Sequence, residues 1–235
     1  PYSYVVTYGR FPSTTDVYDS AGRKVKNIHE KPLIEAMPQG FMATAPGKRT
    51  IGWRSDKPAT LYWAEALDGG DPAREVEHRE ASFEWPAPFT GAPRSVAKTL
   101  DRFAGIEWGD DETAVLYDQW WNTRNRRTYV FSPSDPSREP VILFDRNYQN
   151  VYTDPGAFDN KRNEYGRYVL NLNGKKAYLI GDGYSPEGKF PFVDEIDLRT
   201  QATKRLYQSA YIDKVLDIVS LKDMKAGELL VRLQS

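Results

Sequence analysis

The one dense cluster of basic side chains in the sequence is WNTRNRRT, which holds Arg124, Arg126 and Arg127. Each guanidinium group presents a planar set of donors that can bind both oxygens of one carboxylate. At the end of a strand, such a cluster could hold an acidic group of a substrate. Alternatively, it could be the solvated tip of a hairpin and the start of the next strand. Both interpretations stay open, and the three arginines are our candidate substrate-binding residues.

No arrangement of residues indicates a catalytic centre. The nearest approach to the Gly-x-Ser-x-Gly turn of an α/β serine hydrolase is GYSPE at 183–187, which lacks the last glycine. Only His29 and His78 could act as bases, and both stand among polar residues. We therefore expect no catalytic residue in this chain.

Metal and cofactor sites are not indicated either. Two widely separated histidines and no cysteine do not supply the clustered ligands of a zinc site. GDGYSPEG is rich in glycine but lacks the Lys-Ser/Thr and the helix of a phosphate-binding loop, so we expect a loop between strands. Asp110-Asp111 stands where a related segment has Ser55-Asp56, which favours a turn over the paired acids of a glycosidase. We expect no cofactor and no metal.

The composition suits one large soluble domain or two small ones. The chain has 235 residues, 40% hydrophobic and 28% charged. Its net charge of −1 lacks the basic excess of proteins that bind phosphate backbones, so we expect no nucleic-acid partner. No apolar run approaches the roughly 20 residues that cross a bilayer, so we expect no membrane partner. The lack of cysteine excludes disulfides and fits either redox compartment.

The first residues, PYSYVVTYGR, have neither an initiator Met nor the charged start and apolar stretch of a signal peptide. We therefore expect a fragment of a longer protein. The sequence does not indicate a compartment, although we expect an exported or periplasmic location if the source is bacterial.

Short apolar runs separated by glycine and proline predict an all-β fold. Strand–turn–strand units are predicted at residues 15–28, 128–145, 167–183 and 194–208, and two further strand-like runs end the chain. The unit at 167–183 would turn at Asn173-Gly174. No long segment keeps a helical period, and only residues 95–103 could hold one turn of helix.

Residues 51–62 and 106–117 repeat one pattern. The shared positions are Ile51, Trp53, Asp56, Ala59, Leu61 and Tyr62 in the first copy, and Ile106, Trp108, Asp111, Ala114, Leu116 and Tyr117 in the second. A set of strands repeated about every 50 residues is typical of propeller blades. Runs such as TAVLYDQWW do not alternate cleanly between apolar and polar residues, which predicts burial of both sheet faces. This pattern favours a propeller over the alternative, a β-sandwich with a wet outer face.

We therefore predict a partial β-propeller of about four blades, each an antiparallel four-stranded sheet, in an open arc. The approximate blades are 1–47, 48–104, 105–155 and 156–213, with the start of a further blade at 214–235. The repeated segments would form equivalent strand–turn–strand pieces of neighbouring blades. Asp56 and Asp111 would lie in their turns and bond their own backbone two residues on. Trp53 and Trp108 would be mostly buried between blades.

Three stretches carry a resemblance to a known family. They are WAEALDGGD at 63–71, GIEWGDDETAVLYDQWWNTRNRRTYVFSP at 105–133 and ILFDRNYQNVYTDPG at 142–156. PFVDEIDL and RLYQS extend it, so that it covers residues 51–209. In this order and spacing, the stretches resemble the prolyl oligopeptidase family of serine peptidases, in its glutamyl endopeptidase-like branch of bacteria and plastids.

The resemblance implies an N-terminal propeller followed by an α/β-hydrolase domain with catalytic Ser, Asp and His, a domain absent from this chain. In that family the propeller covers the active site, restricts access to peptides and helps to bind them, and this branch cleaves after glutamate. The resemblance therefore implies a non-catalytic propeller segment whose partners are a peptide substrate and the hydrolase domain. The alternatives are a stand-alone propeller that binds carbohydrate or protein, and an enzyme such as a glycosidase.

Overall fold

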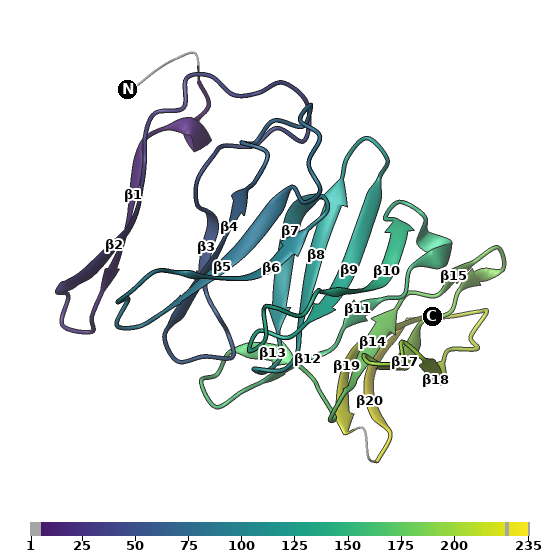
Figure 1. The fold of residues 1–235 in the computed structure, drawn as a ribbon. Coiled ribbons are helices and arrows are strands. Elements are labelled where there is room, and N and C mark those ends of the chain that lie inside the picture. The colour runs from purple at the N-terminus through teal and green to yellow at the C-terminus, as the bar shows by residue number, and fades with distance from the viewer. Residues whose placement is uncertain (1–5, 224–225, 235) are drawn as a thin grey trace.

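The computed structural model describes residues 6–223 and 226–234 as a row of small antiparallel sheets. Figure 1 shows the four-stranded sheets side by side in chain order. Within the described residues the helical elements are two short 3-10 helices, η1 (Tyr8–Arg10) and η2 (Val151–Thr153).

Three sheets have four strands each, and we call them the first, second and third blade. The first blade comprises β3 (Arg49–Trp53), β4 (Thr60–Ala66), β5 (Glu80–Pro86) and β6 (Arg94–Thr99). The second comprises β7 (Arg102–Trp108), β8 (Ala114–Trp120), β9 (Asn125–Phe131) and β10 (Val141–Asn147). The third comprises β11 (Ala157–Phe158), β14 (Lys176–Gly181), β17 (Phe192–Asp197) and β18 (Thr203–Gln208). In each blade, neighbouring strands pair antiparallel in chain order.

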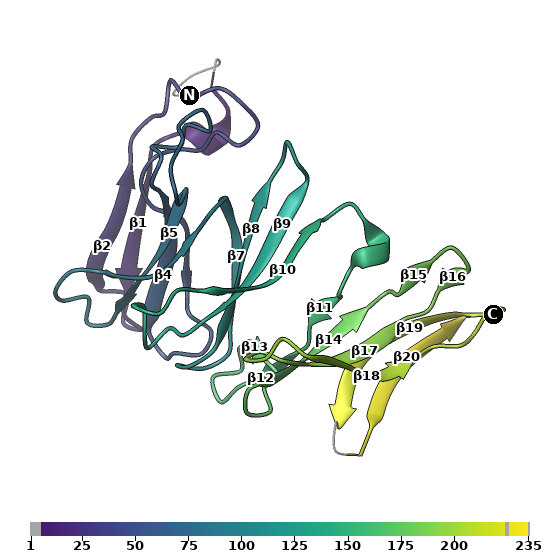
Figure 2. The same ribbon diagram turned by 45° about the vertical axis from the view of Figure 1, so that its right-hand side comes forward.

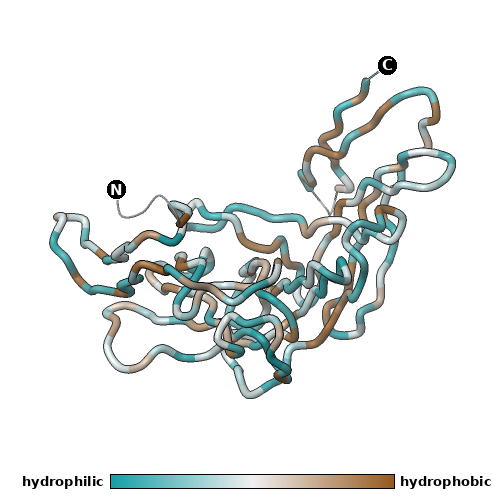
Figure 3. The backbone as a smooth tube through the Cα atoms, turned by 90° about the horizontal axis from the view of Figure 1, so that it is seen from above, coloured by the Kyte–Doolittle hydropathy of each residue, from teal (hydrophilic) through white to brown (hydrophobic). Residues whose placement is uncertain are grey.

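Four two-stranded hairpins complete the described fold. They are β1 (Ser13–Tyr18) with β2 (Lys24–Lys31), β12 (Asn160–Arg162) with β13 (Tyr168–Leu170), β15 (Tyr184–Ser185) with β16 (Gly188–Lys189), and β19 (Val215–Asp223) with β20 (Glu228–Gln234). The β1–β2 hairpin precedes the first blade, and the β19–β20 hairpin follows the third (Figure 2). Seen from above, the described chain forms an open arc (Figure 3). The predicted fold class, an all-β partial propeller, is confirmed.

Three hydrophobic cores lie between successive sheets, from the β1–β2 hairpin to the third blade. Ile28 of the β1–β2 hairpin packs with residues of the first blade, and a second core joins the first and second blades. Alternate residues of β8 serve two cores, because Leu116 packs toward the first blade and Val115 toward the third. A strand covered on both faces needs apolar residues at successive positions. This requirement explains the lack of clean alternation in TAVLYDQWW.

The repeated segments form the first two strands of neighbouring blades. Residues 51–62 cover parts of β3 and β4, and residues 106–117 cover parts of β7 and β8. Leu61 and Leu116 both pack toward the preceding sheet. The strand registers differ, because Trp53 pairs with Leu61 whereas Trp108 pairs with Ala114.

The expectation that both tryptophans are buried is wrong for Trp53. Trp108 is 3% exposed, whereas Trp53 is 44% exposed. Trp108 faces the four-stranded first blade, where the ring of Tyr62 lies 5.4 Å away and the guanidinium carbon of Arg54 lies 4.2 Å from its ring centroid. The sheet before Trp53 is only the two-stranded β1–β2 hairpin, and the ring of Phe89 lies 6.2 Å from the ring of Trp53.

The expected bonds of Asp56 and Asp111 to their own backbone are also wrong. Asp56 accepts hydrogen bonds from the guanidinium of Arg54, at 3.0 Å from Nε. Asp111 accepts one from Nζ of Lys57 at 2.5 Å. The local bond in the second turn belongs to Asp110, whose Oδ1 accepts from the backbone N–H of Glu112 at 2.9 Å. The aspartates of the repeat therefore pair with cations.

Two predictions of local structure need correction. Residues 95–103 form no helical turn, because they belong to β6, β7 and the bend between them. A tight turn does follow Asn173, which forms an isolated bridge with Lys176. The flanking strands β13 and β14 do not form a ladder with each other, since β13 pairs with β12 and β14 pairs with β11 and β17.

The β12–β13 hairpin ties the third blade to the first. It leaves the third blade between β11 and β14, and its turn contacts the β3–β4 loop. The guanidinium of Arg167 donates hydrogen bonds to the carbonyl oxygens of Arg54, Lys57 and Pro58, at 3.0, 2.8 and 3.3 Å. Asn163 Nδ2 donates another to the carbonyl of Ser55 at 2.8 Å.

Replacing Arg167 with alanine is expected to lower the free energy of unfolding by about 1.5–3 kcal/mol, because three backbone carbonyls lose a charged donor. Denaturant unfolding of the protein measures this change. Arg199→Ala is the matched control, since Arg199 is exposed and its substitution should change stability by less than about 0.5 kcal/mol. Equal effects of the two substitutions would contradict a tie between blades.

Candidate functional site

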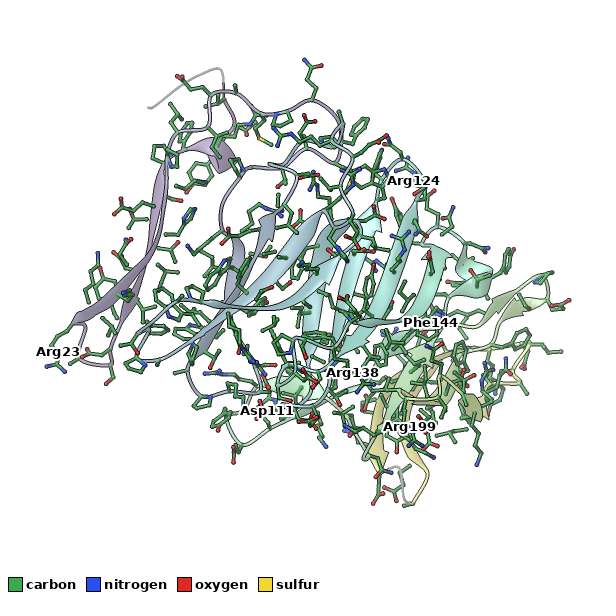
Figure 4. The ribbon with its side chains drawn as sticks, viewed as in Figure 1. Arg23, Asp111, Arg124, Arg138, Phe144 and Arg199 are labelled. Carbon is green, nitrogen blue, oxygen red and sulfur yellow. The ribbon has the colours of Figure 1, made fainter. Side chains whose placement is uncertain are left out.

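The three candidate arginines lie on the β8–β9 hairpin of the second blade but point in different directions. Arg124 occupies the turn with a φ of 57°. Its guanidinium carbon lies 3.6 Å from the ring centroid of Trp121, and Nη1 lies 3.5 Å from the hydroxyl of Tyr148. Figure 4 shows Arg124 at the opposite end of the second blade from Asp111 and Arg138. Stacking on tryptophan holds this guanidinium at the tip of the hairpin.

Carboxylates of the chain itself already surround the guanidinium of Arg127. Its Nη1 lies 2.5 Å from Asp101, and its Nε lies 3.0 Å from Asp145. Asp118 lies 3.8 Å from Nη1 and accepts a hydrogen bond from the hydroxyl of Tyr129 at 2.7 Å. A guanidinium with three such neighbours has little capacity left for an external carboxylate.

Arg126 lies on the other face of β9 and is exposed. Its guanidinium donates one hydrogen bond, to Oε1 of Gln119 at 3.3 Å. Within residues 6–223 and 226–234 it forms no ion pair with a carboxylate. Arg124 and Arg126 therefore both keep a charge that no carboxylate of the described residues pairs with, but Arg124 is stacked on Trp121 at the tip of the hairpin.

Arg126 lines a groove of about 610 Å³ on the second and third blades. Its charged lining residues are Glu107, Arg126, Asp154, Asp182 and Asp217, and Tyr117 lies among them. Strands β7, β11 and β19 all contribute to it, and they are the first strands of the second blade, the third blade and the β19–β20 hairpin. The first-strand edges of these sheets therefore converge on one side of the arc, where the groove lies.

Most acidic residues of the groove have a basic partner. The pairs are Asp154 with Arg146 at 3.0 Å, Asp182 with Lys189 at 2.9 Å, and Asp217 with Lys189 at 3.0 Å and Arg232 at 2.8 Å. The three aspartates and their three basic partners therefore carry no net charge together.

Glu107 is held differently, by two neutral donors. The hydroxyl of Tyr117 donates to its Oε1 at 2.6 Å, and Nδ2 of Asn160 donates to its Oε2 at 2.8 Å. Burial raises the pKa of the Tyr117 hydroxyl, and the charge of Glu107 raises it further. The phenol therefore stays protonated at neutral pH and keeps its donor role.

Sequence reasoning found Arg126 but missed Glu107, Tyr117 as a groove residue, and the three paired aspartates. The one available signal for Glu107 was the repeat, in which Gly52 takes the equivalent position. A carboxylate replacing a glycine between Ile106 and Trp108 has no role in the repeated packing pattern. Asp154, Asp182 and Asp217 lie on segments that are far apart in the sequence, and only the fold brings them together.

The described residues contain no group of three or more His, Cys, Asp or Glu residues arranged to hold a metal ion. Among the same residues, no helix has the length and hydropathy needed to cross a membrane. The groove instead offers hydrogen-bonding groups, a free guanidinium and a carboxylate along a backbone edge. Such a surface can bind a polar chain with groups of both charges.

Comparison with known proteins finds no matching family model. Two curated relatives are each described as a probable chloroplastic glutamyl endopeptidase. The protein from Arabidopsis thaliana is 39% identical over 240 residues, which cover 97% of this chain and 25% of the relative. The protein from Oryza sativa subsp. japonica is 38% identical over 239 residues, with coverage of 97% and 25%.

Two solved structures show weaker similarity. An oligogalacturonate lyase in complex with manganese has a TM-score of 0.39 and 15% identity, over 80% of this chain and 39% of that one. The S527A variant of the AtxE2 isopeptidase with Astexin3-dC4 bound has a TM-score of 0.38 and 11% identity, over 90% of this chain and 28% of that one.

The stacked four-stranded sheets and their shared inner groove define the chain as part of a β-propeller. The sequence comparison adds the particular kind of protein: the chain is a segment of a glutamyl endopeptidase-like protein. The predicted resemblance to glutamyl endopeptidase-like proteins is therefore confirmed. The chain spans about a quarter of the length of the curated relatives it matches.

Proposed function

We propose that this chain is the non-catalytic propeller segment of a serine peptidase of the prolyl oligopeptidase family, which cleaves peptides after glutamate. In this proposal the segment limits access to the active site and helps to bind the peptide. An α/β-hydrolase domain of the same protein supplies Ser, Asp and His, and this chain alone hydrolyses no peptide. Peptide and hydrolase domain are the partners, and neither nucleic acid nor a membrane is one. The names and extra length of the relatives support this proposal.

The observation that carries the binding role is the state of Arg126. A guanidinium that lines a groove without a carboxylate partner is suited to bind an acidic side chain of a peptide. Arg127 is occupied by Asp101 and Asp145, and Arg124 stacks on Trp121 outside the groove. We therefore assign contact with a substrate carboxylate to Arg126 and not to its two neighbours.

Replacing Arg126 with alanine in the full-length protein is expected to raise KM for glutamate-containing peptides about tenfold and to leave kcat nearly unchanged. An interaction that stabilises substrate and transition state equally affects KM alone, and one charge-assisted hydrogen bond contributes about 1.5 kcal/mol. Steady-state kinetics on paired peptides, with either glutamate or glutamine at one position away from the cleaved bond, measure the effect.

Arg124→Ala is the matched control, because it removes the same charge from the same hairpin outside the groove. It should leave KM for both peptides unchanged. If both substitutions raise KM to the same extent, the effect reflects the net charge of the protein and not contact by Arg126. If Arg126→Ala changes the KM of neither peptide, the proposed binding role of Arg126 is wrong.

A further inference from the structure

Glu107 is the groove residue whose charge the described chain leaves without a partner. Asp154, Asp182 and Asp217 each form an ion pair with a basic side chain. Glu107 forms none within residues 6–223 and 226–234, and Arg126 lines the same groove without pairing with it. A negative charge therefore remains in the wall of the groove.

The two donors of Glu107 fix its position but leave its charge. Tyr117 and Asn160 bind one carboxylate oxygen each, and they belong to different sheets, the second blade and the β12–β13 hairpin. Each oxygen of a carboxylate can accept a further hydrogen bond. Glu107 is thus a half-buried, oriented carboxylate with free acceptor capacity. Partial burial of a charge is unfavourable unless an opposite charge compensates for it.

Arg126 and Glu107 give this wall of the groove two opposite charges beside one aromatic ring. Tyr117 donates its hydroxyl proton to Glu107, and the guanidinium carbon of Arg126 lies 5.9 Å from the centroid of its ring. A ligand that satisfies both residues carries a carboxylate and a cationic group. Peptides combine these two groups, whereas neutral sugars have neither.

We propose that Glu107 binds a positively charged group of the peptide, either the α-ammonium group or a basic side chain, while Arg126 binds a carboxylate. This inference rests on the proposed peptide-binding function of the groove. The charge pair orients the bound chain, because a peptide placed in reverse would bring like charges together. Glu107 and Arg126 then determine which peptides bind, without taking part in bond cleavage.

Glu107 also contributes to structure, because it joins β8 of the second blade to β12 of the β12–β13 hairpin. Glu107→Gln separates the two roles. The amide keeps nearly the same shape and one acceptor oxygen but loses the charge. Tyr117→Phe is the complementary variant, since it removes one hydrogen bond to Glu107 and leaves the charge in place.

The test is binding of peptides with a fluorescent label at the carboxyl end to the full-length protein, followed by fluorescence anisotropy. One pair of peptides has a free or an acetylated amino terminus, and a second pair has an internal lysine or acetyl-lysine. The wild-type protein should bind the charged member of one pair about tenfold more tightly, and that pair identifies the source of the cation. Glu107→Gln should abolish this preference, whereas Tyr117→Phe should retain it.

The outcomes separate this inference from the proposed function. The proposed cationic subsite is wrong if the wild-type protein shows no preference in either pair of peptides. It is also wrong if Glu107→Gln weakens the binding of charged and acetylated peptides equally. The proposed function would still stand in that case if Arg126→Ala weakened binding of glutamate peptides relative to glutamine peptides. If neither Arg126→Ala nor Glu107→Gln alters the binding of any peptide, both proposals are wrong.

Discussion

Replacement of Arg102 with alanine is expected to lower the free energy of unfolding by about 3–5 kcal/mol, as loss of one member of a buried ion-pair cluster does. Arg102 is 4% exposed, and its Nη1 donates to Asp68 at 2.8 Å and to Glu80 at 3.2 Å. Its Nε donates to the carbonyl oxygen of Met42 at 2.7 Å. Asp68 and Glu80 are 0% and 1% exposed, so water cannot replace the lost guanidinium without rearrangement.

The effect should depend on pH. Burial acts to raise the pKa of Asp68, but hydrogen bonds from Arg102 and Arg79 outweigh it and hold that pKa below its usual value. Burial raises the pKa of Glu80, despite the opposing charges of Arg49 and Arg102. Without Arg102 both pKa values should rise. A carboxyl group whose pKa is higher in the folded state than in the unfolded state destabilises the fold at pH values above its unfolded-state pKa. This destabilisation disappears as protons bind at lower pH. The difference between variant and wild type should therefore shrink under acidic conditions.

Urea unfolding at neutral pH and at acidic pH measures both parts of this prediction. Arg138→Ala is the control, because Arg138 is exposed in the loop between β9 and β10 and should change stability by less than about 0.5 kcal/mol. A loss below about 1 kcal/mol for Arg102→Ala would show that Arg79 and Arg49 compensate for its absence. A loss that stays constant down to acidic pH would contradict a cause in uncompensated carboxylates.

The sequence could predict the repeated sheets because their signals are local. Two-sided burial shows as adjacent apolar residues in β8, and each hairpin between neighbouring strands shows as two short runs with a turn. The insertions could not be predicted in this way. Residues 167–183 look like one hairpin, but their two strands do not pair with each other. β13 pairs with the preceding strand β12, and β14 pairs with β17, which lies further along the sequence. Which of several compatible strands pair depends on packing across blades.

The candidate site was predictable only in part for a related reason. Arg126 and Arg127 are adjacent in a strand, so their side chains must point to opposite faces. The sequence could not show that one face holds Asp101 and Asp118 and the other the groove, because these neighbours belong to other elements. Glu107 was missed because its partners, Tyr117 and Asn160, come from two different sheets.

The second large effect is expected from one position of the repeat. Trp108→Ala should lower the free energy of unfolding by about 3–5 kcal/mol, as removal of a large buried aromatic side chain does. Trp108 is packed between Tyr62 at 5.4 Å and Phe131 at 6.1 Å, and the guanidinium of Arg54 covers its ring. Its loss would open a cavity between the first and second blades and remove the cation–π contact of a buried arginine.

Trp53→Ala is the matched variant, because Trp53 holds the equivalent place in the repeat but is 44% exposed. It should cost about 1 kcal/mol, since little packing is lost and no closed cavity forms. Urea unfolding of both variants under the same conditions gives the comparison. Equal losses would mean that Trp53 is covered in solution by some surface other than the β1–β2 hairpin. A threefold or larger difference would show that a tryptophan at this position of the repeat stabilises the protein more when a four-stranded sheet covers it than when a two-stranded hairpin does.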